Sequence, residues 1–153
     1  MRNIQIVAQK QEIDALFIKI GSFSGDFELQ SHWSMYLCVR VSGFLENSVR
    51  ILYREYARSR GHSKLANFVE SRLRGFPNPN MESIIQLAGS FSPMWADSLK
   101  SETEGQLKAS VDSIVSNRHT IVHGGHAGIT LSRVKEYYKN AIKVIELIEE
   151  QCS

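Results

Sequence analysis

The apolar residues of this chain recur with the period of an α-helix, and few segments alternate with the period of a strand. The longest helical pattern runs from about Phe27 to Arg60, and its apolar stripe consists of Trp33, Leu37, Val41, Phe44, Leu45, Leu52 and Tyr56. All three prolines lie between Pro77 and Pro93, so the strongest helix breakers are confined to one short region. These patterns predict an all-α fold.

Breaks in the pattern divide the chain into four main helices and several short ones. GSFSGD ends a first helix that covers about Asn3 to Phe23, and SRGHSK ends the second. A short helix over about Lys64 to Arg74 then stops at GFPNPN. Because the connections are short, we expect antiparallel neighbours and therefore an antiparallel helical bundle.

Capping residues indicate where the later helices begin. Asn80 is expected to cap a short helix, and Ser92 is expected at an N-cap with Pro93 at the first helical position. Ser101 and Glu104 match a capping box, which predicts the start of a helix that reaches about His123. Two glycines then stop this helix, and Thr130 caps the last one, whose stripe is Val134, Tyr138, Ala141, Ile145 and Ile148.

Size and composition favour one domain over residues 1–153. The chain is 42% apolar, which is enough for one core without disulfides or a structural metal. Cys38 and Cys152 lie far apart, and we interpret them as reduced thiols, with Cys38 a buried apolar residue. No apolar run approaches the roughly 20 residues of a membrane helix, and the first twenty residues do not resemble a signal peptide. We therefore expect a cytoplasmic protein.

Positive charge gathers in one part of a chain whose net charge is only +2. Seven bases face two acids, Glu55 and Glu70; the bases are Arg50, Arg54, Arg58, Arg60, Lys64, Arg72 and Arg74. Arg50, Arg54 and Arg58 follow one another at four-residue spacing, so they share a helix face that could hold RNA phosphates, together with Lys64. A solvated helix face explains the same pattern about equally well.

Arg118 occupies an unusual position in NRHTIVHGG, residues 117–125. The apolar stripe of its helix is Leu107, Val111, Ile114 and Ile121, and the position missing from that series is 118. A buried guanidinium is costly unless it is paired. Arg118 therefore either forms a core ion pair, for which Glu46 is a candidate, or lines a cleft or subunit seam and binds an anion.

The histidines beside Arg118 point to proton transfer. His119 and His123 are four residues apart and share a helix face. Arg118 and His123 are separated by about 140° around an ideal helix, so they converge only if the last turn unwinds or a second copy contributes through a two-fold axis. Two imidazoles and a guanidinium suit RNA cleavage by the 2′-hydroxyl, which requires no metal or other cofactor.

These residues resemble a known pattern. NRHTIVHG is similar to the R-x4-6-H motif of the HEPN superfamily, in which the residue after the arginine is commonly polar, here His119. On the second helix, SGFLENSVRILYREY resembles the glutamate-bearing helix of the RiboL-PSP branch of HEPN proteins. The resemblance covers the chain from about Trp33 to its end.

The resemblance implies a helical bundle that forms a homodimer around the motif and acts as a metal-independent endoribonuclease leaving 2′,3′-cyclic phosphate ends. It implies Arg118 and His123 as catalytic residues and His119 as the polar residue that orients the site. Glu46 would be a supporting residue, and Asn117 a weaker one. It also implies a role as a toxin or in anti-phage defence, with an antitoxin or another defence-system protein as a possible partner.

One position departs from the pattern of some HEPN toxins. Where those toxins carry a tyrosine two residues after the histidine, this chain has Gly125, so neutralisation by a nucleotidyltransferase that modifies that tyrosine is not implied.

Three other interpretations fit parts of the sequence. One is a zinc site formed by His119, His123 and His126, although Arg118 would repel a cation. A second is a module of the same fold that binds RNA or nucleotides, or dimerises, without cleavage. The third is a purely structural dimer in which aromatic residues serve as core or interface anchors; these are Trp33, Phe91 and Trp95.

Overall fold

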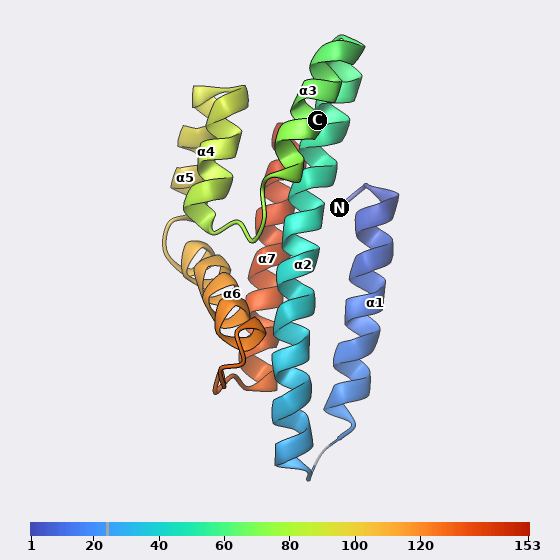
Figure 1. Cartoon of the computed structure of the whole chain (residues 1–153), viewed down its shortest axis with the longest axis vertical. Helices are drawn as coiled ribbons and strands as arrows, with labels where there is room; N and C mark the ends of the chain where they lie inside the picture. The colour runs from blue at the N-terminus through green and yellow to red at the C-terminus, as the bar shows by residue number, and fades with distance from the viewer. Residues whose placement is uncertain (24) are drawn as a thin grey trace.

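The computed structural model describes residues 1–23 and 25–153, and within them the chain is built from helices alone (Figure 1). The helices are α1 (Ile4–Gly21), α2 (Phe27–Arg60), α3 (Ser63–Arg74), α4 (Met81–Phe91), α5 (Pro93–Thr103), α6 (Gln106–Val122) and α7 (Leu131–Gln151). The prediction of an all-α fold is confirmed, as are four main helices, here α1, α2, α6 and α7.

The long helix α2 is the centre of the bundle, because α1, α3, α6 and α7 all pack against it. The start of α1 lies beside the end of α7, and Tyr138 in the first half of α7 reaches Lys10 and Asp14 further along α1. α1 therefore runs antiparallel to α7 and to α2 (Figure 1). α6 lies obliquely across this group, and α4 and α5 form a hairpin beside its upper end (Figure 1).

The core follows the predicted stripes. Leu37, Cys38, Val41 and Leu45 of α2 are almost completely buried, as are the inward residues of α7 named from the sequence. Phe91 and Trp95, from α4 and α5, pack against α2, where Phe91 stacks on Tyr53 with ring centroids 4.9 Å apart. Trp33 is also packed against the core. The three aromatic anchors therefore serve within the chain.

Side-chain caps explain most helix starts. Asn3, Asp26, Asn80 and Thr130 each accept a hydrogen bond from a backbone N–H in the first turn of the following helix. Ser92 occupies the N-cap position of α5, with Pro93 as its first residue, but its side chain makes no capping bond. The predicted caps at positions 80, 92 and 130 are therefore in place, although only two act through their side chains.

The capping box predicted at Ser101 and Glu104 is wrong. Ser101 lies inside α5, which continues to Thr103, and Glu104 is the residue that ends it. The hydroxyl of Thr103 is buried and donates to the carbonyl of Leu99, which keeps this last turn helical. The chain turns at Gly105, whose φ of +89° is a conformation that glycine alone adopts readily. Gly105 is therefore the N-cap of α6, four residues later than the N-cap that the box predicted.

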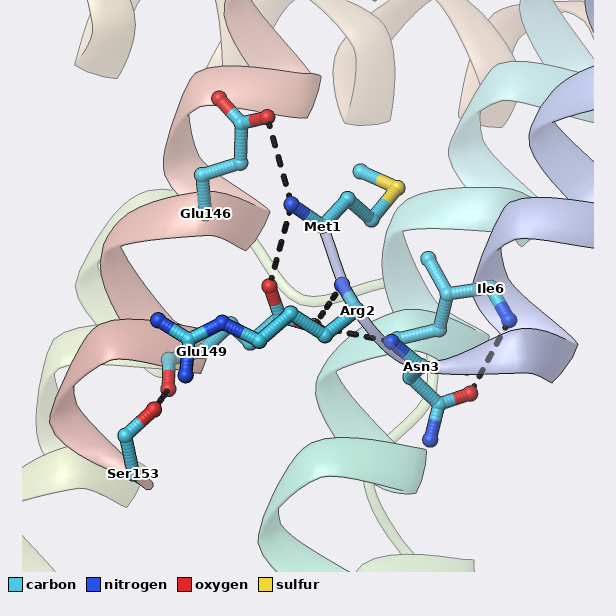
Figure 2. A network of polar contacts seen from close by, with 7 residues as sticks. All are labelled: Met1, Arg2, Asn3, Ile6, Glu146, Glu149 and Ser153. Carbon is cyan, nitrogen blue, oxygen red and sulfur yellow. Dashed lines mark hydrogen bonds and ion pairs between the residues drawn. The ribbon is translucent and has the colours of Figure 1, made fainter.

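A carboxylate fastens the start of α1 to the end of α7 (Figure 2). Glu149 accepts hydrogen bonds from the backbone N–H groups of Arg2 and Asn3, at 2.7 Å and 3.1 Å, and pairs with the Met1 ammonium at 3.2 Å. Asn3 also donates to Glu55 of α2 at 2.7 Å. These contacts join three helices at one end of the bundle. No helix in the described ranges is both long and apolar enough to cross a bilayer.

Candidate active site

The segment NRHTIVHGG forms the last turns of α6 and the bend that follows. α6 ends at Val122, with His123 as its C-cap, and Gly124 adopts a φ of +81°. The N–H of Gly125 donates to the carbonyl of Thr120 at 2.8 Å, and the N–H of Gly124 donates to that of Ile121 at 3.1 Å. This pair of bonds is the Schellman arrangement, and it confirms the predicted stop at the two glycines.

Each glycine is needed for a different reason. Gly124 supplies the positive φ, whereas Gly125 supplies space. A Cβ atom at position 125 would lie 2.7 Å from the methyl carbon of Thr120 and 2.9 Å from its carbonyl oxygen. The two glycines therefore hold the end of α6 tightly folded, and this fixes where His123 lies.

His119 and His123 lie together on the exposed surface of α6. Their ring centroids are 4.4 Å apart with an angle of 59° between the ring planes, which confirms that they share a helix face. Neither imidazole donates to or accepts from another side chain among residues 1–23 and 25–153. Both rings are thus accessible to a ligand and are not held by the protein.

Arg118 borders the apolar stripe, as its position predicted. Val111 and Ile114 are fully buried, Ile121 is partly buried against the core, and Arg118 is half-buried. Within the described part of the chain its guanidinium has no ion pair and no hydrogen bond. An arginine placed at the edge of a core without a carboxylate is suited to bind an anion from outside.

By helix geometry, Arg118 and His123 leave α6 in different directions within one chain. The N–H of His123 still donates to the carbonyl of His119 at 3.2 Å, so the last turn has not unwound. With the helix intact, the two positions are separated by about 140° around its axis. One protomer therefore presents the imidazole pair on one face and the guanidinium on another.

Glu46 is not the partner of Arg118. One of its carboxylate oxygens pairs with Arg50 at 3.2 Å, and the other accepts a hydrogen bond from the N–H of Asn78 at 2.7 Å. Asn78 has a φ of +46°, an uncommon conformation for a residue other than glycine. The carboxylate thus stabilises the turn between α3 and α4, and the alternative of a core ion pair with Arg118 is not what the structure contains.

Asn117 also has an internal role. Its side-chain amide donates to the carbonyl of Ser113 at 2.8 Å, one turn earlier in α6. The residue is half-buried. Its amide nitrogen is therefore oriented by its own helix and does not reach the imidazoles.

The four basic residues predicted to hold RNA, three on α2 and Lys64 at the start of α3, differ in whether the chain already binds them. Arg50 donates to the carbonyls of Arg74 and Phe76, in addition to its pair with Glu46, and so closes the end of α3. Arg58 pairs with Glu70 of α3 at 2.8 Å. Lys64 is exposed, whereas Arg54 is half-buried between the two helices. The four residues therefore do not form one continuous solvated face.

The three histidines considered for zinc do not assemble a site. No group of three or more histidine, cysteine, aspartate or glutamate side chains placed to hold a metal occurs within the described ranges. His126 lies in the loop beyond the glycines, and only His119 and His123 form a close pair.

The thiols are poor nucleophiles. Cys38 is completely buried, and burial raises its pKa to about 11. Burial, with a smaller contribution from the charge of Glu149, raises the pKa of Cys152 to about 12. Because the thiolate is the reactive form, neither residue is suited to covalent catalysis near neutral pH.

The comparison with protein families agrees with the motif. The family model described as RiboL-PSP-HEPN matches residues 5–153, nearly the whole chain. The chain belongs to the RiboL-PSP-HEPN family. HEPN domains are all-helical and are commonly ribonucleases, so the match supports a nuclease-type fold for this member. Neither a curated protein nor a solved structure matches the chain significantly.

Proposed function

We propose that this RiboL-PSP-HEPN protein is a metal-independent endoribonuclease and that Arg118, His119 and His123 form its active site. The observation that carries the proposal is the end of α6. The ring centroids of two exposed imidazoles, those of His119 and His123, lie 4.4 Å apart. His119 directly follows Arg118, whose half-buried guanidinium has no carboxylate partner among the described residues. The family to which the chain belongs supports the same assignment.

The chemistry uses these groups as base, acid and anion binder. One neutral imidazole takes the proton of the 2′-hydroxyl, and the 2′ oxygen attacks the adjacent phosphorus. As the bond from phosphorus to the 5′ oxygen breaks, a second, protonated imidazole donates its proton to that oxygen. The guanidinium stabilises the additional negative charge on the phosphate oxygens. The products are a 2′,3′-cyclic phosphate and a 5′-hydroxyl.

A homodimer is the second part of the proposal. Arg118 and His123 project in different directions from an intact helix, so one phosphate contacts both only if two copies of α6 meet near a two-fold axis. In that arrangement the guanidinium of one protomer faces the imidazoles of the other. The apolar side chain of Val122, which lies within the motif and is 49% exposed, would be covered by the second copy.

The direct test is cleavage of end-labelled single-stranded RNA and of a tRNA pool in the presence of EDTA. We expect the wild type to cleave and His123→Ala to be inactive. His62→Asn is the matched control, because it removes an exposed imidazole and keeps an N-cap residue at the start of α3. If the wild type does not cleave any pool, or if His123→Ala cleaves as well as the wild type, the proposal is wrong.

Mixing two inactive variants tests the composite site. A heterodimer of Arg118→Ala and His123→Ala contains one site with both groups intact if the groups come from different protomers. After co-refolding we expect about a quarter of the wild-type rate, since half of the dimers are mixed and each has one intact site. Activity no higher than that of either variant alone would place the site within one protomer.

The proposal also includes a role as a toxin or in anti-phage defence, in which an antitoxin or another defence-system protein restrains the activity. This part of the proposal rests on the family alone. The alternative function is RNA binding or dimerisation without cleavage. The basic residues favour this alternative as much as they favour an enzyme, since Arg54 and Lys64 can hold phosphates in either case. RNA binding with no cleavage in the assay above would establish it.

A further inference from the structure

A second place suited to an anion lies between α2 and α3, away from the motif. A pocket of about 220 Å³ opens there. Its polar lining comes from α2 and α3 and consists of Asn47, Arg50, Arg54, Glu70 and Arg74. The buried side chains of Ile51 and Leu73 also line it. Three guanidiniums on an apolar support are a favourable environment for a negative charge, because the apolar side reduces solvent screening.

Arg54 lacks an acceptor at the buried part of its side chain. Its Nε atom is inaccessible to solvent and makes no hydrogen bond within the described residues. No ion pair involves Arg54 in the same part of the chain. A buried N–H of a charged group without an acceptor is costly. The chain therefore does not satisfy this guanidinium, and its positive charge is available to an anion in the pocket that Arg54 lines.

The surrounding charges leave the pocket positive. Glu70 also lines it, but its carboxylate is paired with Arg58 at 2.8 Å. Arg50 is paired with Glu46, although its Nε is likewise buried without an acceptor. After these two pairs are counted, Arg54 and Arg74 have no ion-pair partner among residues 1–23 and 25–153.

We propose that this pocket binds a phosphate group through Arg54 and Arg74, with the side-chain amide of Asn47 as a further donor. Planar guanidiniums bind phosphate oxygens in pairs, which suits two arginines on facing helices. The pocket is smaller than the roughly 300 Å³ at which drug-sized ligand pockets begin. It therefore fits one phosphate, either free or carried on a larger molecule that extends into solvent.

The phosphate pocket is distinct from the R-x4-H site. Ile114, one turn before Arg118, contacts Cys38 of α2, and Arg54 lies sixteen residues further along that helix. This spacing corresponds to about 24 Å along α2 and to about 160° around it. A single phosphate cannot contact both sites in one protomer, so the inference holds whether or not the protein cleaves RNA.

Thermal unfolding of the full chain tests the pocket. Inorganic phosphate is compared with chloride at the same ionic strength, because a ligand of the folded state raises the unfolding temperature. We expect phosphate to raise that temperature and Arg54→Gln to weaken the apparent affinity about tenfold or more. Arg60→Gln is the matched control, because it removes an equal charge from an exposed position on the same helix outside the pocket.

Arg74→Gln provides a second variant in case Arg54→Gln does not fold, and it should weaken phosphate binding in the same way. Two RNA oligonucleotides of one sequence, with and without a 5′-phosphate, distinguish the source of the group. Tighter binding of the phosphorylated RNA assigns the pocket to an RNA end, whereas a response to inorganic phosphate alone assigns it to a small anion. If phosphate has no effect beyond that of chloride, or if Arg54→Gln and Arg74→Gln respond as Arg60→Gln does, the inference is wrong.

Discussion

The end of α6 and the Glu149 clamp, which consists of Glu149 and the residues Met1, Arg2 and Asn3 that it binds, use polar groups in opposite ways. In the clamp, one carboxylate accepts two backbone N–H groups and pairs with an ammonium, so its hydrogen-bonding capacity is used within the chain. At the end of α6, the side chains of Arg118, His119 and His123 make no such contact among the described residues. Polar groups satisfied by the chain hold the fold, and those left available are the ones that can act on a ligand.

Removing the available groups should affect activity far more than stability. We expect His123→Ala to reduce the cleavage rate about 10²–10⁴-fold and Arg118→Ala about 10²–10³-fold, measured as initial rates on labelled RNA. The free energy of unfolding should change by less than about 0.5 kcal/mol for His123→Ala, because the ring is exposed and bonded to no side chain. If the variants lost stability to the same extent as they lost activity, the end of α6 would contribute to the fold as the contacts of Glu149 do, and the two regions would not differ in this respect.

The clamp should behave in the reverse manner. Glu149→Ala leaves two backbone N–H groups without their acceptor and the Met1 ammonium with only the more distant Glu146, so we expect a loss of about 2–3 kcal/mol in the free energy of unfolding. Cleavage at a temperature where the variant remains folded should be unchanged. Glu150→Ala is the control, since Glu150 is exposed and its side chain makes none of these contacts. Equal urea midpoints for the two variants would show that the clamp contributes little.

Gly125 links structure and site, so its substitution should affect both. In Gly125→Ala the new Cβ would lie 2.7 Å from the Thr120 methyl carbon, and relieving this overlap should cost about 1–2 kcal/mol. The bend must shift, and His123 moves with it, so cleavage should fall while the protein stays folded. Gly128→Ala is the matched control, because nothing lies within 4 Å of a Cβ there. If Gly125→Ala and Gly128→Ala have the same cleavage rate and the same stability, the bend at Gly125 does not determine the position of His123.

The sequence predicted the helices and the motif because both depend on local patterns. The stripe of α2, the caps at Asn80 and Thr130 and the stop at Gly124 are determined by neighbours three or four residues away. The capping box at Ser101 gave a wrong prediction because a capping pattern can lie inside a helix. Here that helix is α5, which has already started at Pro93.

Contacts between distant segments could not be predicted in this way. Glu46 was expected near the motif, both as a candidate ion-pair partner of Arg118 and through the resemblance, yet its partners are Arg50 and the N–H of Asn78. Arg50 and Arg58 have the spacing of a solvated face, but α3 folds back and engages both. Asn47 could have been added to the series, because it lies three residues before Arg50, whereas nothing local indicated that Arg74 would face Arg54 across a pocket.

The smallest expected effect concerns the pH dependence of the clamp. Burial alone raises the pKa of Glu149, but the backbone N–H groups of Arg2 and Asn3 and the Met1 ammonium outweigh it and lower the pKa below its usual value. The folded state therefore releases this proton more readily than the unfolded state. The contribution of Glu149 to stability is complete at a pH above its pKa in the unfolded state, and it is lost as the pH falls through its pKa in the folded state. Urea unfolding from about pH 7 to about pH 3 should show that the difference in the free energy of unfolding between the wild type and Glu149→Gln narrows at the acid end.

Glu146→Gln is the control for this pH series. It removes a more exposed carboxylate 3.8 Å from the same ammonium, so the difference from the wild type should be smaller at every pH. A gap for Glu149→Gln that stayed constant with pH would mean that the clamp acts through shape and not through charge.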